Sequence, residues 1–431
     1  MKHILSAIIC FVLFALNALA QRSGVPIGTS SNSINSGVSI QLVRRFQHYN
    51  AATKNGNDVF DNSINSPKSV NILNEKNKFY VNSLEGETTS VYDLTTFKRL
   101  KIIEHRFNAK NQHLFKPNAN ANFNFKTKST DLNFFNGKPV ESCFSHNGKY
   151  LWITYYRRSY DANAIDPSAV CIIDTDADSI VRVITTASLP KMIACSPNSK
   201  TIAISHWGDN TVTLIDITSN NPQLFSFIDN IAIDYRMNLN FSANSKIDRD
   251  NNCGNCLRGT EFTPDNKFIL IGKMGGNGIA IIDFEKRKYL GTVTGMKTNM
   301  RHLISKDGYL YLSSNKYGYV QKTNLNDFVN YFKTNTNLGA FNKWENAYVG
   351  IGARTISIDP SGKYVFAAVN NESKVAIVRT SDMKVVASCD ADSYPVGMDL
   401  SEDGKTLIVT AQGKPGGGGN SVMVFKVSYG N

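Results

Sequence analysis

The sequence predicts an all-β fold, a seven-bladed β-propeller closed by an N-terminal strand, from three observations. First, an apolar segment, a turn rich in Pro, Asn, Asp, Gly and Lys, and a second apolar segment recur seven times along the 431-residue chain. Second, a third apolar segment follows most copies, and alternating polarity with β-branched residues favours strands throughout. Third, we find no long stretch in which apolar residues recur at helical spacing. Such repetition is typical of folds built from one repeated supersecondary unit.

The seven copies can be aligned by the position that opens each first strand. The clearest copies lie at residues 193–205, 260–272, 356–369 and 398–410, and weaker ones begin at residues 70, 142 and 303. This register makes positions 68, 140, 191, 258, 301, 354 and 396 equivalent. The shortest intervals between them match the roughly 40–45 residues of a four-stranded propeller blade. The longer intervals indicate blades with insertions, near residues 104–138, 221–255 and 324–350.

The last blade lacks a fourth strand of its own. Its third strand, at residues 421–427, is followed only by the last few residues of the chain. Residues 37–46, GVSIQLVRRF, have the alternation needed to complete the blade. Pairing the two ends of the chain would remove an exposed sheet edge that otherwise invites aggregation. We therefore predict that an N-terminal strand closes the ring.

The first twenty residues have the pattern of a secretory signal peptide. Lys2 precedes an apolar run at residues 4–16, and Ala18-Leu19-Ala20 provides a small-residue cleavage site. The run is too short to span a bilayer, and we expect no transmembrane segment elsewhere. The predicted organisation is a signal peptide at residues 1–20, a leader at 21–36 and a single propeller domain at 37–431. We expect a periplasmic or secreted protein that is cleaved after Ala20.

The composition indicates a globular protein with an excess of positive charge. Hydrophobic residues make up 42% of the chain and charged residues 19%, which suits a large core and excludes a disordered polymer. The formal net charge is +12. This charge favours anionic partners such as acidic polysaccharide, lipid headgroups or carboxylated small molecules, and nucleic acid is a further but weakly supported partner. Alternatively, an evenly spread excess would only keep the protein soluble.

The positions that open the first strands are mostly basic. In chain order they carry Lys68, Val140, Lys191, Arg258, Arg301, Arg354 and Val396. First strands line the central channel of a propeller, so the basic side chains would converge on one funnel, where they could hold carboxylate or phosphate groups. Tyr394 and Trp207 would add stacking surfaces. The alternative is that these lysines and arginines point to solvent or cap strand ends, because register does not fix side-chain direction.

Parts of the repeated phrase resemble a known repeat. Phe79-Tyr80-Val81-Asn82-Ser83, Ser90-Val91-Tyr92-Asp93-Leu94 and Ser361-Gly362-Lys363-Tyr364-Val365 resemble the YVTN-type β-propeller repeat of the YncE-like family, over roughly residues 66–427. The resemblance implies seven blades and a location in the cell envelope. The family is similar to lactonase and cyclase propellers, but no motif in this sequence carries the lactonase acid and base residues.

Two of the cysteines form a distinct pair. Most of the others lie in apolar strands, where a thiol behaves as a small hydrophobic group: Cys143, Cys171 and Cys195. Cys253 and Cys256 instead lie at the end of a polar insertion, residues 238–255, directly before the first strand of the fourth blade. Three interpretations of this pair are open: a local disulfide, a redox pair and half of a metal site. Covalent haem attachment is disfavoured, because Leu257 stands where that motif has a His. We favour the disulfide, given an oxidising compartment.

Several other segments carry weaker signals. Asp248-Arg249-Asp250-Asn251-Asn252 offers oxygen ligands, but Cys253 replaces the glycine of a calcium-binding loop. The glycine-rich stretch at residues 413–420 fits a hairpin loop better than a phosphate site, since no helix follows it. The aromatic and basic cluster at residues 155–160 could stack bases or sugars, or could be ordinary packing. Aromatic side chains in the insertions suit packing over a propeller face or against another protein. We predict no metal and no cofactor.

No acid–base constellation for catalysis is recognisable in the sequence. His302 is the best-placed histidine, and it joins the predicted ligand-binding set of Lys68, Lys191, Arg258, Arg301 and Arg354. A lone histidine is more often structural, so we assign no catalytic residue. The sequence therefore predicts a non-catalytic binding or interaction module whose partner is an anionic ligand or an envelope protein complex. A scaffold subunit of a surface or secretion complex and a lactonase-like hydrolase are the alternatives.

Overall fold

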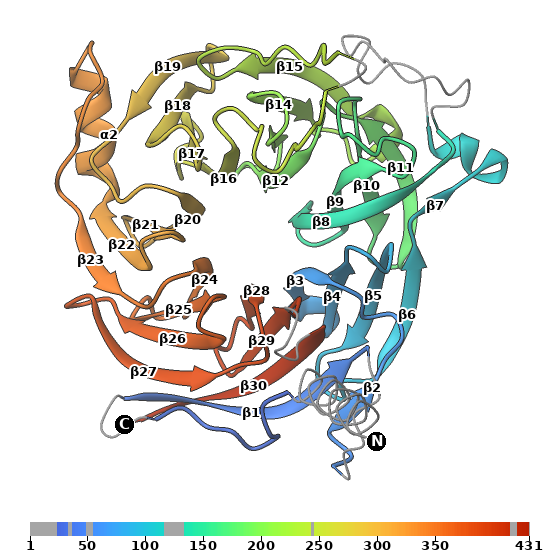
Figure 1. Ribbon diagram of the computed structural model, residues 1–431, viewed down its shortest axis with the longest axis vertical. Helices are drawn as coiled ribbons and strands as arrows, with labels where there is room; N and C mark the ends of the chain where they lie inside the picture. The colour runs from blue at the N-terminus through green and yellow to red at the C-terminus, as the bar shows by residue number, and fades with distance from the viewer. Residues whose placement is uncertain are drawn as a thin grey trace, which may run out of the picture.

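The computed structural model describes residues 24–32, 37–48, 55–115, 133–242, 245–413 and 420–430. Seven β-sheets stand around a common axis, and each presents its first strand to the centre (Figure 1). The predicted all-β, seven-bladed propeller is therefore confirmed. The predicted signal peptide at residues 1–20 and its cleavage site after Ala20 lie outside the described residues. Within the described ranges, no helix has the length and apolar character needed to cross a bilayer.

Blades 1 to 3 come from residues 67–232. Blade 1 consists of β3 (Pro67–Leu73), β4 (Lys78–Ser83), β5 (Thr88–Asp93) and β6 (Arg99–Glu104). Blade 2 consists of β8 (Phe135–Ser145), β9 (Tyr150–Arg158), β10 (Ala169–Asp174) and β11 (Ser179–Thr185), with the short β7 (Arg106–Phe107) beside β8. Blade 3 consists of β12 (Pro190–Cys195), β13 (Thr201–His206), β14 (Thr211–Asp216) and β15 (Ser226–Ala232). Short 3-10 helices occur at η1 (Asn74–Lys76), η2 (Ala109–Leu114) and η3 (Pro222–Leu224).

Blades 4 to 7 follow in chain order around the ring. Blade 4 consists of β16 (Leu257–Phe262), β17 (Phe268–Lys273), β18 (Ile279–Asp283) and β19 (Lys288–Val293). Blade 5 consists of β20 (Met300–Lys306), β21 (Tyr309–Ser314), β22 (Tyr319–Asn324) and β23 (Glu345–Tyr348). Blade 6 consists of β24 (Ala353–Ile358), β25 (Tyr364–Val369), β26 (Lys374–Arg379) and β27 (Lys384–Asp390). Blade 7 begins with β28 (Pro395–Leu400), β29 (Thr406–Ala411) and β30 (Ser421–Tyr429).

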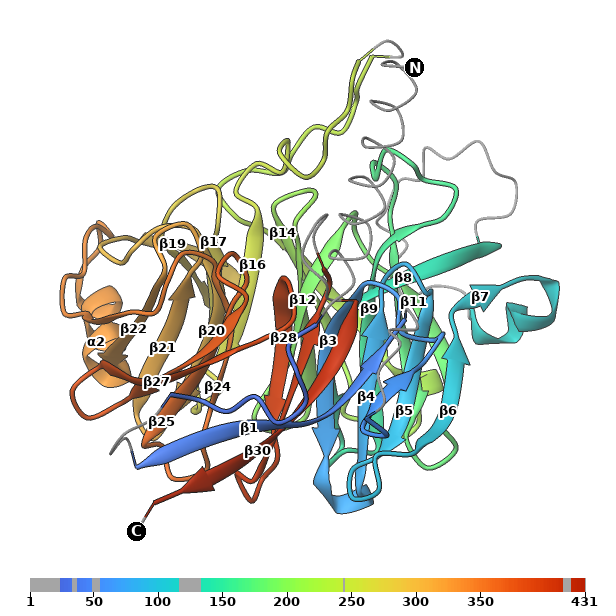
Figure 2. The same ribbon diagram turned by 60° about the horizontal axis from the view of Figure 1, so that its bottom comes forward.

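The N-terminal part of the chain completes blade 7, as we predicted. β1 (Val38–Gln47) pairs antiparallel with β30 along its whole length (Figure 2). Its buried side chains Val38, Ile40 and Leu42 pack in a core shared with blade 6. β2 (Asp58–Phe60) adds a parallel strand outside β1. The described part of the predicted leader, residues 24–32, runs beside β1, where the Gly28 N–H donates to the Leu42 carbonyl.

The repeated phrase folds into the hairpin between the first and second strands of a blade. In four blades the polar residue that opens the turn accepts a hydrogen bond from the backbone N–H five positions later, and these residues are Ser196, Thr263, Asp359 and Ser401. Side chains of this kind satisfy backbone donors that a tight turn leaves without a partner. In these four blades the turn chemistry therefore helps to fix the register of the hairpin, and with it the face that each side chain occupies.

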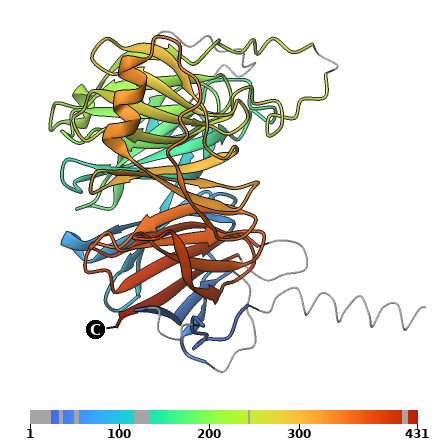
Figure 3. The same cartoon turned by 90° about the vertical axis from the view of Figure 1, so that its left-hand side faces the viewer.

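The insertion in blade 5 contains a helix that we did not expect from the sequence. α2 (Leu325–Thr334) begins after Asn324, whose side chain accepts a hydrogen bond from the Asp327 N–H. Its side chains Leu325, Phe328 and Phe332 are buried against blades 4 and 5, and Figures 1 and 3 place the helix at the outer rim. The segments predicted as insertions at residues 221–255 and 324–350 also contain the fourth strands β15 and β23.

Candidate functional site

A β-bulge marks the equivalent position in the first strand of every blade. In all seven blades, the register between the first and second strands shifts at a step that spans this position. A bulge bends its strand and re-aims the side chain that it carries. Seven side chains therefore leave the channel wall at matching points: Lys68, Val140, Lys191, Arg258, Arg301, Arg354 and Val396.

Backbone constraints on the preceding residues hold these bulges in place. In six blades the residue two positions earlier has a left-handed backbone, and these residues are Ser66, Leu189, Cys256, Asn299, Gly352 and Tyr394. This conformation is unfavourable for large side chains such as leucine and tyrosine, so the surrounding fold must impose it. In four blades proline fills the position between and fixes φ there: Pro67, Pro139, Pro190 and Pro395. The direction of each bulged side chain is thus set by strained and restricted backbone.

The five basic residues at these positions, which we call the collar, converge at one mouth of the channel: Lys68, Lys191, Arg258, Arg301 and Arg354. Arg258, Arg354 and Lys191 are 2%, 4% and 9% exposed, and the other two are half-buried. Desolvation lowers the pKa of Lys68, and Arg354, Lys191 and Arg258 on other blades lower it further. Desolvation and then Arg354 and Arg258 likewise lower the pKa of Arg301. Cations from different blades therefore lie close enough to repel one another, and they do not simply point to solvent.

The positive charge of the collar is only partly compensated. Arg258 Nη2 donates to Glu141 Oε1 at 3.0 Å. Within the described parts of the chain, Glu141 is the acidic residue that forms an ion pair with the collar. Lys68 Nζ donates to a neutral amide oxygen, that of Gln412, at 3.0 Å. The Nε atoms of all three arginines and Nη1 of Arg258 are buried without a hydrogen-bond partner within the described residues. Because buried cations without counter-charge cost free energy, an anion at this mouth would stabilise the protein.

Aromatic rings flank the collar on two sides. Lys191 Nζ lies 4.1 Å from the ring centre of Tyr156 and 5.2 Å from that of Trp207. Arg354 Cζ lies 5.9 Å from the ring centre of Tyr394. Contacts of this length allow cation–π attraction, which supports a charged side chain in a partly dehydrated site. Trp207 and Tyr394 are the two aromatic residues expected beside the funnel, and Tyr156 belongs to the 155–160 cluster, for which the sequence leaves stacking and ordinary packing open.

Behind the collar, the channel holds a cavity of about 400 Å³ lined by the first strands of all seven blades. In each blade the lining starts one or two residues after the bulged position, for example at Met192, Thr260 and Thr355. Polar side chains tie neighbouring first strands together, as when Thr355 Oγ1 donates to the Val396 carbonyl at 2.6 Å. The collar therefore stands at the entrance of a chamber with a hydrogen-bonded wall.

Two carboxylates in this wall have raised pKa values because they are desolvated. The pKa of Glu261 is raised to about 7 and that of Asp399 to about 6. Glu261 Oε1 accepts hydrogen bonds from the N–H and the hydroxyl of Ser305 at 2.9 and 2.5 Å, and Asp399 Oδ2 accepts one from the Ile72 N–H at 2.7 Å. Glu261 therefore links blade 4 to blade 5, and Asp399 links blade 7 to blade 1. The positions of these two acids in the sequence did not indicate such contacts.

We expect Glu261→Gln to remove part of the pH dependence of stability. A carboxyl whose pKa is raised by folding stabilises the protein below its unfolded pKa, and this contribution is lost as the pH rises through the folded value of about 7. The loss amounts to at most about 3 kcal/mol, and glutamine keeps an oxygen that can accept from Ser305. Thermal unfolding should show the variant gaining stability relative to wild type between about pH 5 and about pH 8. A difference that does not change with pH would contradict this role.

His302 lies in the cavity wall, one residue behind the collar. Its Nδ1 accepts a hydrogen bond from the Ile356 N–H at 3.3 Å, which ties blade 5 to blade 6. Burial lowers the pKa of His302 to about 4, so the ring is neutral at neutral pH. We had grouped His302 with the ligand-binding residues, whereas the structure gives this nitrogen a bridging contact between blades.

A disulfide joins Cys253 and Cys256 directly before β16. The bridge packs against Leu189 and Trp207, and Trp207 Nε1 donates to the Arg249 carbonyl at 3.2 Å. It therefore anchors both the segment that leads to collar residue Arg258 and the aromatic ring beside Lys191. Free thiols occur at the other described cysteines, Cys143, Cys171, Cys195 and Cys389.

Other predicted features have structural contacts or fall outside the described residues. The Asp248 carboxylate accepts hydrogen bonds from the N–H groups of Asp250 and Asn251, which is turn chemistry. Tyr155 and Arg158 are buried within blade 2. Phe123 and Phe125 of the first insertion and residues 414–419 of the glycine-rich stretch are not described. Throughout the described ranges, no three His, Cys, Asp or Glu side chains come together as metal ligands would.

Comparison with solved structures supports the β-propeller fold. No protein-family model and no curated protein matches the sequence. Among solved structures, the chain is similar to Kuenenia stuttgartiensis hydrazine synthase, with a TM-score of 0.56 and 14% identity over 89% of this chain and 100% of that chain. It is also similar to the Myceliophteria thermophila Cps50 (Swd1) β-propeller domain, with a TM-score of 0.57 and 12% identity over 84% of this chain and 97% of that one. At such low identity, these likenesses show the β-propeller fold alone.

Proposed function

We propose that this protein is a binding module whose collar takes a compact anion with two or more negative charges. β-Propellers often serve as binding or scaffold modules, and here the ring brings five cations from five blades to one mouth. One observation carries the proposal: among the described residues, only Arg258 of the three collar arginines has a carboxylate partner, Glu141, while Arg301 and Arg354 have none and the Nε atoms of all three are buried without a hydrogen-bond partner. An anionic ligand would supply the missing counter-charge and hydrogen-bond acceptors.

A polyvalent anion suits the collar better than a monovalent one. Arg258, Arg301 and Arg354 lie on blades 4, 5 and 6, and Lys191 lies on the adjacent blade 3. Arginine can donate two parallel hydrogen bonds to a carboxylate or phosphate, so neighbouring arginines can hold neighbouring acidic groups. Burial and then repulsion from the other collar residues lower the pKa values of Lys68 and Lys191, and each negative charge on a ligand would relieve that repulsion. In a partly dehydrated mouth these effects are stronger than at an open surface.

Two of the seven equivalent positions carry valine instead of a basic residue, and they give the site an apolar side. Val140 and Val396 are 1% and 3% exposed and flank Lys68 on blades 2 and 7. Tyr156 beside Lys191 donates a hydrogen bond to Asp250 of the polar insertion, which brings that insertion to the edge of the mouth. A small molecule with acidic groups on a short carbon skeleton fits these surroundings, as in di- and tricarboxylates or phosphate esters of similar size.

The proposal also places the mature protein in the periplasm or outside the cell. The predicted signal peptide at residues 1–20 is the basis for this location. The Cys253–Cys256 disulfide supports it, because disulfides persist mainly in oxidising compartments. The resemblance to YVTN-type envelope propellers stays a prediction that agrees with it.

A calorimetric titration of the mature chain with acetate, succinate and citrate tests the proposal. We expect affinity to rise with ligand charge, so that citrate binds at least about tenfold more tightly than acetate. Added sodium chloride should weaken the binding, because mobile ions screen the collar. Inorganic phosphate and pyrophosphate, titrated in parallel, show whether phosphate or carboxylate oxygens are preferred. Equal affinity for all these anions, or no saturable binding, would contradict the proposal.

A further inference from the structure

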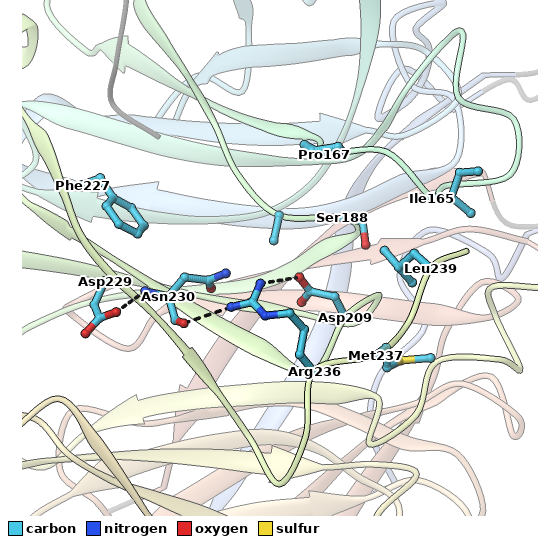
Figure 4. A pocket seen from close by; sticks show the side chains of 11 residues that line it. Ile165, Pro167, Ser188, Asp209, Phe227, Asp229, Asn230, Arg236, Met237 and Leu239 are labelled. Atoms are coloured by element: carbon cyan, nitrogen blue, oxygen red, sulfur yellow. Dashed lines mark hydrogen bonds and ion pairs between the residues drawn. The ribbon is translucent and has the colours of Figure 1, made fainter. Parts of the chain in front are cut away.

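A second cavity, of about 490 Å³, opens between blades 2 and 3 and shares no lining residue with the collar. Its lining comes from the loop that precedes β10, the connection between β11 and β12, the loop before β14, and the segment from β15 into the polar insertion. Figure 4 shows the Arg236 side chain reaching between Asn230 and Asp209. Acidic, basic and apolar side chains thus line one partly open cavity.

Two of the three charged residues that line this cavity, Arg236 and Asp209, face each other without a direct hydrogen bond. Arg236 Nη1 and Asp209 Oδ2 lie 4.0 Å apart, whereas a charge-assisted hydrogen bond spans about 2.7–2.9 Å. Arg236 Nη2 also donates a hydrogen bond to the backbone carbonyl of Asn230 at 3.3 Å, which helps to orient the guanidinium. Asp209 Oδ1 accepts from the N–H and the hydroxyl of Thr211, but Oδ2 accepts no hydrogen bond from the described residues. A carboxylate oxygen and a half-exposed guanidinium therefore face each other across a gap.

A buried hydroxyl in the same cavity lacks a partner. Ser188 is 3% exposed, and its Oγ has no hydrogen-bond partner among the described residues. Asp209 is 5% exposed, and desolvation raises its pKa to about 6, against the hydrogen bonds from Thr211 and the charge of Arg236. Leaving buried polar groups incompletely paired costs free energy that a bound ligand could offset. An ammonium group would satisfy both residues, since it carries three donors and a positive charge.

Apolar side chains form one end of the cavity. Ile165 and Leu239 lie together there in Figure 4, with Met237 next to them, while Phe227 and Asp229 lie toward the other end. The volume exceeds what one small side chain fills and lies within the roughly 300–1,000 Å³ typical of small-ligand sites. The ligand therefore needs an apolar part that reaches away from the open charge pair.

We propose that this cavity binds an apolar α-amino acid. The ligand carboxylate pairs with the Arg236 guanidinium, the ammonium lies between Asp209 Oδ2 and Ser188 Oγ, and the side chain packs against Ile165, Met237 and Leu239. In an α-amino acid the two charged groups sit on one carbon, which matches an acid and a base that face each other at short range. The proposal does not depend on the collar, because the two sites have no residue in common.

Calorimetry with the full mature chain and L-leucine as the probe tests this assignment. Leucinamide lacks the carboxylate and 4-methylpentanoate lacks the ammonium, so each should bind roughly ten- to a hundredfold more weakly than leucine. Arg236→Gln and Asp209→Asn should weaken leucine binding by a similar factor, while Arg287→Gln, an exposed arginine in the β18–β19 turn, should leave it unchanged. Citrate binding should be the same in all three variants if the collar acts separately.

Three results would overturn the assignment. One is the absence of saturable binding to any of L-leucine, L-isoleucine, L-valine and L-methionine at millimolar concentrations. Another is leucine binding that Arg236→Gln leaves unchanged; this variant decides the matter if Asp209→Asn fails to fold, because the Arg236 side chain is 50% exposed. The third is binding of the dipeptide Leu-Leu without binding of leucine, which would assign the cavity to peptides instead.

Discussion

A chain that begins at His48 is expected to unfold far below the temperature at which a chain beginning at Gly37 unfolds, or not to fold at all. The shorter chain lacks β1, whose side chains Ile40 and Leu42 are 1% and 0% exposed in the core. Losing one buried aliphatic side chain costs about 2–5 kcal/mol, and a whole domain is stable by about 5–15 kcal/mol. Removing the strand therefore costs an amount comparable to the total stability. Calorimetry of the two truncated chains measures the difference.

Loss of β1 should also change solubility, since β30 would become an open edge. Unpaired N–H and C=O groups on a long edge strand template aggregation, which light scattering would detect. Leu42→Ala tests the same contact without deleting backbone, and Gln41→Ala, an exposed neighbour on the same strand, is the matched control. Unfolding temperatures that agree for the two truncated chains, or for Leu42→Ala and Gln41→Ala, would mean that the ring does not need β1.

Replacing Arg258, Arg301 and Arg354 together by glutamine is expected to abolish saturable binding of citrate. Each arginine can supply charge-assisted hydrogen bonds worth about 1.5–3 kcal/mol, so three losses lower the affinity by several orders of magnitude. Glutamine keeps a donor for Glu141, so the carboxylate is not left unpaired. Titration calorimetry of the variant against wild type at one salt concentration measures the effect.

The matched control removes the same amount of charge elsewhere. Lys286 and Arg287 are exposed in the β18–β19 turn of blade 4 and Lys288 is exposed at the start of β19, and changing all three to glutamine alters the net charge equally. This control should bind citrate like wild type. Arg301→Gln alone should weaken binding with little effect on unfolding temperature, because Arg301 is half-buried and makes no ion pair among the described residues. Equal losses in the collar variant and in the turn variant would show that only net charge matters.

Much of the fold was predictable because repetition and alternation are local properties. The turn phrase placed the seven hairpins, and the missing fourth strand of blade 7 pointed to β1. α2 was not predicted, because its buried residues Leu325, Phe328 and Phe332 form a helical stripe of only a few turns inside an irregular insertion. Short stripes of this kind do not stand out from a β-rich background.

The collar was predictable in position but not in direction. Register showed that five basic residues are equivalent, while the bulges that aim them emerge only from the pairing of strands. The prolines before four of the seven positions are the one signal in the sequence for this restricted backbone. The channel acids Glu261 and Asp399 and the cavity around Asp209 and Arg236 depend on contacts between blades or loops. Sequence spacing carries no trace of such contacts.

Diffraction from crystals of the mature chain soaked in selenate would locate a bound divalent anion by its anomalous signal. The proposed function predicts a strong peak at the channel mouth, within hydrogen-bonding distance of guanidinium nitrogens of at least two of Arg258, Arg301 and Arg354, and no such peak in the triple glutamine variant. Selenate found only at exposed lysines, with the mouth between the three arginines empty of anion, would contradict it.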